Sequence, residues 1–483
     1  MKTKIFAATV AAATVFAASA QAQNWSAAAA QDLQGIHDTL RDSSPAAVAD
    51  RDNAQFKAWL DTGLAQAKAL PLNQITNDRG YGYALRAYAT GFRDPNIDAF
   101  PIYAPQAPWY AIDWPGFALA WRGGAYVVAW TTPGDNKQPP LGAKLISCDK
   151  VPAETIAMKR LDRFEGNLKL DSDRVKTAPY LLWNRANPFV DPLPAKCDFD
   201  QGGRKRTFQI NSQIGGEDLR KQAYMAGAPK AEGIGIEPFA GGFWINLHNM
   251  ADGQDWNGFT AKLEAARDAI HAAPIVVIDM RGAEGGNLIN GYRVANWIWN
   301  PDYITANQPR VTQLAYRVSP QNIKFYQEVL AHLQSDDNYY AERPKWESLV
   351  ASLNQAQAAG QPLFQRDESG APVTPAPENP LKAKVIVLTD SWCTSACLDM
   401  MDLFTKLPNV TQAGGATSVN SIFIGREDIL LPSGQGRVSF GGKAWLDRAR
   451  NSTTPYTPAP AMTYTGAPGD EAAYKAWVQS IAH

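Results

Sequence analysis

Two short runs of aliphatic residues constrain the fold of this chain more than any other feature. Ile275–Ile278 and Val385–Leu388 are apolar at every position, as in strands of a sheet covered on both faces. Beyond the second run, Cys397, Met401 and Phe404 recur at spacings of four and three, the period of a buried helix face. The sequence therefore predicts an α/β fold in which buried strands alternate with helices.

Ser395 lies at the junction between the second run and this helix, and we consider it a candidate nucleophile. A side chain at a helix start lies beside unpaired backbone N–H groups and the positive end of the helix dipole. A negative charge developing on a bound carbonyl would be stabilised there. The alternative is that Ser395 only caps the helix.

The first run continues into a glycine-containing segment at residues 279–286. The adjacent Gly285 and Gly286 allow a tight turn that presents bare N–H groups, as in many oxyanion or phosphate sites. A simple turn is the alternative explanation.

Together, D-x-R-G-x-x-G-G at 279–286 and T-S-A at 394–396 resemble the tail-specific, or C-terminal-processing, serine peptidase family, which includes the tricorn core protease. The resemblance covers roughly Gly233 to Ala459. It implies a ClpP/crotonase-like core of stacked strand-helix units.

In such peptidases the serine oxygen attacks a peptide carbonyl and forms an acyl-enzyme. The resemblance makes Ser395 the nucleophile and gives the oxyanion donors as the N–H groups of Ala396 and of Gly285 or Gly286. Asp279 and Arg281 would be structural, a buried ion pair that holds the glycine turn.

The general base is missing from both positions that the family uses. One branch has a lysine where Asn420 stands in Gly414–Ser421, and the tricorn-like branch has a histidine where Asn96 stands in Arg93–Ile97. An amide cannot act as general base near neutral pH. The glutamate of the tricorn-like branch is also absent from residues 451–456.

His248 is a tentative substitute base. It follows a predicted strand, Phe243–Leu247, whose end should face the same side as Ser395 and Gly285. The alternative is an ordinary polar loop residue.

Charge and composition exclude several other functions. Lys and Arg number 46 against 47 Asp and Glu, without a basic run, which argues against nucleic-acid partners. No cluster of His and Cys has metal-ligand spacing, and no cofactor is implied. The expected partner is a peptide or unfolded protein.

The first residues resemble an export signal. Lys2 and Lys4 precede the apolar run Ile5–Ala18, and cleavage is expected before Gln23. The mature chain should have no integral membrane segment and should be periplasmic or secreted.

Export makes disulfides plausible among the four cysteines. One set of pairs would join Cys148 to Cys197 and Cys393 to Cys397, the second pair flanking Ser395. Buried thiols are the alternative, and the sequence leaves all three connectivities open.

Five parts are expected along the chain. Leu141–Lys150 resembles the turn-strand-turn of a PDZ-like module, with a generic small β domain as the alternative. An insertion at 316–357 would cover the sheet or form a lid. The parts are a signal peptide at 1–22, a helical N-terminal region at 23–104, a PDZ-like β domain at 105–215, a peptidase-like α/β core at 233–465 and a C-terminal helix at 466–483.

These observations favour an exported serine peptidase acting on unfolded or C-terminal segments. A degenerate, non-catalytic peptide-binding member of the same family is the main alternative, because Asn96 and Asn420 occupy the base positions. A glycan- or surface-binding protein is a weaker one, suggested by 15 tryptophans.

Overall fold

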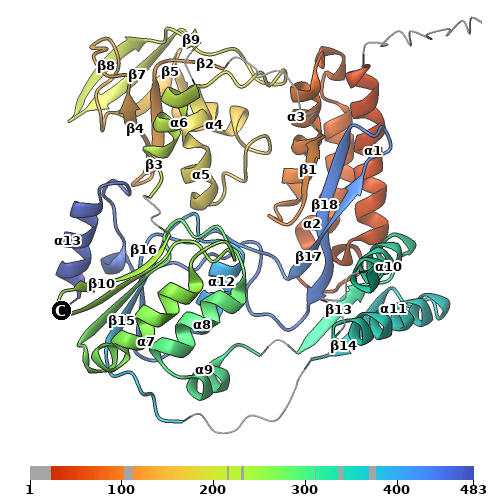
Figure 1. Ribbon diagram of the computed structural model, residues 1–483. Helices are drawn as coiled ribbons and strands as arrows, with labels where there is room; N and C mark the ends of the chain where they lie inside the picture. Colours follow the sequence, from red (N-terminus) through yellow and green to blue (C-terminus); the bar gives the residue numbers. More distant parts are fainter. Residues whose placement is uncertain are drawn as a thin grey trace, which may run out of the picture.

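The computed structural model describes residues 23–102, 112–214, 217–229, 233–310, 312–335, 341–368 and 377–482. The expected signal segment at 1–22 lies outside the described residues. The described residues form three larger sheets with their helices and one two-stranded pair, and Figure 1 shows the larger sheets side by side. No helix among the described residues is long and apolar enough to cross a bilayer.

The central sheet contains both apolar runs from which the fold was predicted. Its strand order is β10-β11-β12-β15-β16, with β11, β12, β15 and β16 parallel and β10 antiparallel at the edge. The strands are β10 (Ile234–Phe239), β11 (Gly242–Leu247), β12 (Ile275–Asp279), β15 (Lys384–Thr389) and β16 (Val410–Gly414). The helices of this part are α7 (Trp256–Ala272), α8 (Leu288–Ile298), α9 (Pro301–Asn307), α12 (Ala396–Phe404) and α13 (Glu471–Ile481), with a short 3₁₀ turn at Pro460–Met462.

Alternate side chains of each central strand enter two different cores. Val276 and Ile278 pack with residues of α7, α8 and α12, whereas Val277 packs with Tyr474 and Val478 of α13 on the other face. All five are at most 2% exposed. Burying a side chain of this size stabilises the fold by about 1.5–3 kcal/mol, which explains why these strands are apolar at every position.

A second sheet, which the sequence analysis missed, joins segments far apart in the chain. Its order is β1-β18-β13-β14, with β17 also paired to β18, and every pairing is antiparallel. The strands are β1 (Asp98–Pro101), β13 (Gln313–Arg317), β14 (Leu363–Asp367), β17 (Phe423–Leu430) and β18 (Gly436–Trp445).

Helices from two parts of the chain pack against this second sheet. The N-terminal helices share a core with Phe423, Val438 and Phe440, while α10 and α11 share one with Leu314 and Tyr316 (Figure 1). The expected insertion therefore covers a sheet. The helices are α1 (Trp25–Ser43), α2 (Ala54–Lys68), α3 (Asp78–Ala89), α10 (Pro320–Ser335) and α11 (Arg343–Ala358), with 3₁₀ turns at Pro45–Ala47, Leu72–Gln74 and Thr90–Phe92.

Two features add to the expected organisation. Residues 233–465 contribute strands to both the central and the second sheet. The N-terminal region is not helical to its end, because Asp98–Pro101 pairs with β18. Pairing with a distant strand leaves no local periodicity from which either feature could be predicted.

The third sheet has the order β3-β4-β5-β7-β8, with β6 paired to β5. A disulfide between Cys148 and Cys197 joins β5 to β7 within its core. The strands are β3 (Phe117–Arg122), β4 (Ala125–Thr131), β5 (Lys144–Cys148), β6 (Val151–Pro152), β7 (Lys196–Gln201) and β8 (Arg204–Gln209), with a small separate pair of β2 (Asp113–Trp114) and β9 (Gln213–Ile214). Its helices are α4 (Ala153–Arg160), α5 (Asp171–Thr177) and α6 (Glu217–Met225), with a 3₁₀ turn at Ala178–Leu182.

Polar contacts join α3 and the turn after it to the segment that follows α4. The Arg93 guanidinium donates two hydrogen bonds to Asp162, of 2.9 and 2.8 Å. The Tyr83 hydroxyl donates to Glu165 at 2.7 Å, and Arg185 pairs with the same carboxylate. The N-terminal helices thus contact the part that carries the third sheet.

Several of the tryptophans are structural. Trp114, Trp183, Trp244, Trp256 and Trp299 are all buried and pack in hydrophobic cores. They cannot form an aromatic surface for a glycan, which weakens the observation that suggested such a ligand.

Candidate active site

The ends of the parallel strands β12 and β15 bring the two predicted segments together. Ser395 precedes the first residue of α12 and has φ of 53° and ψ of −120°. A residue other than glycine in this region is strained by about 1–3 kcal/mol. Its side chain makes no capping hydrogen bond, and the residue is exposed. A capping role therefore does not account for Ser395.

The strained turn is fixed on both sides of Ser395. A disulfide joins Cys393 to Cys397. The Thr394 N–H donates to the Ala283 carbonyl at 3.2 Å, which ties the serine turn to the glycine segment. The Ser418 N–H donates to the Cys393 carbonyl at 3.1 Å. The hydroxyl is thus presented by a turn with little freedom to move.

Gly285 lies directly opposite Ser395. A Cβ on Gly285 would be 3.0 Å from the Ser395 Cβ and 3.4 Å from its Oγ, and the φ of Gly285 is +132°. Any side chain there would be strained and would crowd the hydroxyl. No backbone hydrogen bond between described residues uses the N–H of Gly285, Gly286 or Ala396. These three amides therefore remain available as hydrogen-bond donors, and Gly285 is the one whose residue lies against the serine side chain.

An ion-pair network holds the glycine segment at residues 279–286 in place. The buried Arg281 donates to Asp279 at 2.9 and 2.6 Å and to Glu471 of α13 at 3.1 and 3.0 Å. Its guanidinium lies 3.8 Å from the ring centre of Tyr474. Burial alone would raise the pKa of Asp279, but the charge of Arg281 and the contact with His248 outweigh it and hold that pKa below its ordinary value.

Asp390 is a partly buried carboxyl between the two segments, and the sequence analysis did not single it out. It accepts hydrogen bonds from the Gly282 N–H at 3.1 and 3.2 Å and from the Trp392 N–H at 2.8 Å. Burial raises the pKa of Asp390 to about 6, against the lowering effect of these bonds. The sequence feature that could have identified Asp390 is its position directly after an apolar strand.

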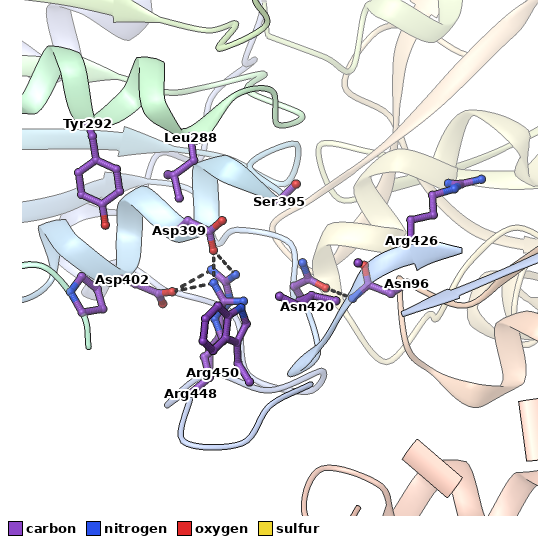
Figure 2. A pocket seen from close by; sticks show the side chains of 14 residues that line it. Asn96, Leu288, Tyr292, Ser395, Asp399, Asp402, Asn420, Arg426, Arg448 and Arg450 are labelled. Carbon is purple, nitrogen blue, oxygen red and sulfur yellow. Dashed lines mark hydrogen bonds and ion pairs between the residues drawn. The ribbon is translucent and has the colours of Figure 1, made fainter. Parts of the chain in front are cut away.

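Asn96 and Asn420, separated by 324 positions, meet beside the serine (Figure 2). The Asn96 side-chain amide donates to Asn420 Oδ1, to the Phe423 carbonyl at 2.7 Å and to Ser421 Oγ at 3.2 Å. Both asparagines line a cavity of about 550 Å³ together with Ser395. The structure therefore brings to one cavity the two asparagines that the sequence resemblance singled out.

A charged cluster, also missed from the sequence, lines the same cavity (Figure 2). Arg448 and Arg450 both pair with Asp399, and Arg450 lies 3.2 Å from Asp402. Asp399 is one helical turn beyond Ser395 on α12. These four charges, two of each sign, leave this wall of the cavity without net charge.

His248 is buried and lies 3.0 Å from Asp279 Oδ2. It is at the end of β11, on the expected edge of the sheet, but it does not line the cavity that contains Ser395. Among the described residues, no group of three or more His, Cys, Asp or Glu side chains could hold a metal ion.

A hydroxyl presented on a strained strand-to-helix turn, opposite unbonded amides, is the construction of a serine-hydrolase site. No family model and no curated protein matches the chain. Solved structures do match. A mutant of CPAF is 12% identical with a TM-score of 0.60, and the match covers 95% of this chain and 96% of that one. Mature CPAF is 12% identical with a TM-score of 0.56, and the match covers 90% of this chain and 92% of that one.

The photosystem II D1 C-terminal processing protease and the tricorn protease also match, but their TM-scores of 0.32 and 0.35 are too low to support an argument. The fold similarity therefore rests on the two CPAF structures. At 12% identity the similarity to CPAF shows a shared fold alone.

Proposed function

We propose that this chain is an exported serine peptidase of the tail-specific type, which cleaves peptide bonds in unfolded or C-terminal segments through an acyl-enzyme on Ser395. The observation that carries the proposal is the exposed, strained serine facing Gly285 beside three unbonded amides. The fold shared with CPAF supports it.

In this mechanism Ser395 Oγ attacks the carbonyl carbon of the substrate. The developing oxyanion accepts hydrogen bonds from the N–H groups of Ala396 and of Gly285 or Gly286. The leaving amine takes a proton, and water then hydrolyses the ester. Asp279 and Arg281 hold the glycine turn and touch no reacting atom.

The hydroxyl proton must pass to a base. His248 is the histidine at the correct edge of the sheet, and its contact with Asp279 would stabilise it after protonation. Because it does not line the cavity of Ser395, it would act through an intervening water.

The domain organisation belongs to the same proposal. Residues 105–215 would be a PDZ-like domain that binds an extended peptide, and 233–465 a ClpP/crotonase-like core, flanked by the 23–104 region and the 466–483 helix. The two disulfides support export through an oxidising compartment.

A fluorophosphonate probe tests the nucleophile. We expect labelling of the folded protein at Ser395 and hydrolysis of an unfolded protein substrate. Ser395→Ala should abolish labelling and lower hydrolysis by ~1,000-fold or more, whereas Ser480→Ala, an exposed serine on α13, should change neither. If no labelling occurs at any pH while circular dichroism shows an intact fold, the acyl-enzyme mechanism is excluded.

The second candidate is a peptide-binding protein without turnover. The hydrogen bond between Asn96 and Asn420 favours it, because each amide stands where a base is needed and satisfies the other. It predicts saturable peptide binding that survives Ser395→Ala, with no hydrolysis in either form.

Supplying a base separates the two candidates. If the amides are the cause of inactivity, Asn420→Lys should produce fluorophosphonate labelling of a previously unreactive Ser395, and Asn420→Met, of similar length, should not. Ser395-dependent hydrolysis by the unmodified protein would instead exclude the non-catalytic candidate.

A further inference from the structure

The cavity of Ser395 borders a second cavity on α8. A second cavity, of about 530 Å³, is lined by residues of this helix and its neighbours. Tyr292 lines both cavities, and Leu288 of the first is followed by Ile289 of the second. Figure 2 shows Leu288 and Tyr292 side by side near Ser395. We call the second cavity the α8 groove.

The residues that form the α8 groove lie on one face of the helix. Ile289, Tyr292, Arg293, Asn296 and Trp297 recur at spacings of three and four or in adjacent positions, while Val294, Ala295 and Ile298 point into the core. The groove is therefore built on an element whose opposite face is held rigidly.

Apolar surface and positive charge occur together in the α8 groove. Ile289 is 67% exposed, unusually high for a large aliphatic side chain. Trp297 lies nearby with the Arg267 guanidinium 5.8 Å from its ring centre. Among the described residues, no carboxylate forms an ion pair with Arg267 or Arg293. These cations are free to pair with a ligand.

Asn296 supplies a polar group in the same place. Its side-chain oxygen is buried and has no hydrogen-bond partner among the described residues. A half-turn of this amide would offer the oxygen to the N–H of an extended peptide.

We propose that the α8 groove is a secondary subsite for the substrate peptide, selecting segments in which an aromatic or aliphatic residue stands beside an acidic one. The inference rests on the proposed function: because Tyr292 lines both cavities, a peptide bound at Ser395 is the occupant that would extend into the groove. The apolar residue contacts Ile289 and Trp297, and the acidic residue pairs with Arg293 or Arg267. The same subsite serves a catalytic or a non-catalytic protein.

Fluorescence anisotropy with the Ser395→Ala protein measures binding without turnover. Fluorescein-labelled peptides on a Gly-Ser host would carry Phe-Glu, Phe-Lys or Gly-Glu. We expect the Phe-Glu peptide to bind most tightly, and Ile289→Ala or Trp297→Ala to weaken it by about tenfold. Leu430→Ala, which truncates another exposed aliphatic residue outside both cavities, is the matched control and should leave the affinity unchanged.

Charge reversal gives a second readout. Arg293→Glu should transfer the preference from the Phe-Glu to the Phe-Lys peptide, and a melting curve checks that the variant is folded. Equal affinities for the three peptides, or an unaltered preference in Arg293→Glu, would each overturn the subsite. Fluorophosphonate labelling of Ser395 does not depend on these outcomes, so failure of the subsite and failure of the proposed chemistry are distinguishable.

Discussion

Glu427 of β17 is a buried carboxyl away from the candidate site. It is fully buried, and neither carboxyl oxygen has a hydrogen-bond partner among the described residues. Burial raises the pKa of Glu427 to about 8, and the charge of Lys443 offsets only part of that rise. Gly442 leaves room for the carboxyl, since a Cβ there would lie 1.8 Å from its Oε1.

This carboxyl makes stability depend on pH. Between the ordinary pKa of 4.5 and about 8, the folded protein holds a proton that the unfolded chain releases. The free energy of unfolding should therefore fall by about 1.4 kcal/mol for each pH unit as the pH rises through this window. Above the window it should become constant. Glu427→Gln should lose less stability between these pH values in urea unfolding.

Glu347→Gln, which changes an exposed glutamate on α11, is the matched control and should keep the original pH dependence. If both variants lose stability equally between the two pH values, Glu427 is not the responsible group.

At the scale of single elements, the turn between β15 and α12 is more constrained than its length requires. The Cys393–Cys397 disulfide, the bond from Thr394 to Ala283 and the positive φ of Ser395 all lie within five consecutive residues. These constraints on the turn orient the Ser395 hydroxyl more than they stabilise the fold of the whole chain.

Removing this bridge should therefore affect reactivity more than stability. In the chain-entropy model, replacing Cys393 and Cys397 by alanine costs about 2 kcal/mol, against about 4 kcal/mol for the longer Cys148–Cys197 loop. We expect the first pair of substitutions to slow fluorophosphonate labelling of Ser395 and the second to leave its rate unchanged while lowering the melting temperature more. Equal slowing in both variants would show that the turn does not need its own bridge.

At the scale of the whole molecule, local patterns predicted what lies close together in sequence. The apolar runs at 275–278 and 385–388, the helix after Ser395 and the pairing of β11 with β12 follow from periodicity and chain order. The second sheet does not, because β1 pairs with β18 across more than 330 positions of chain. Long-range antiparallel pairing leaves no repeat to detect.

In the candidate site, too, contacts between neighbouring strand ends could be predicted and long-range contacts could not. Ser395 and Gly285 each follow a strand, and parallel strand ends meet, so their proximity could be predicted. The contact between Asn96 and Asn420 could not, although each position was noted separately. The pairing of Arg448 and Arg450 with α12 was missed because it joins a loop to a helix about 50 positions away.

The junction between the α3 helix and Glu165 has a practical consequence. That carboxylate is 6% exposed and is satisfied by Tyr83, Arg86 and Arg185, two of which come from α3. A fragment excised to study the third sheet by itself would uncover this carboxylate, together with Asp162 and the aromatic ring of Phe164. Ligands captured by such a truncated piece would include binders of a face that the intact molecule never offers, so dissection experiments should cut elsewhere or retain the amino-terminal helices.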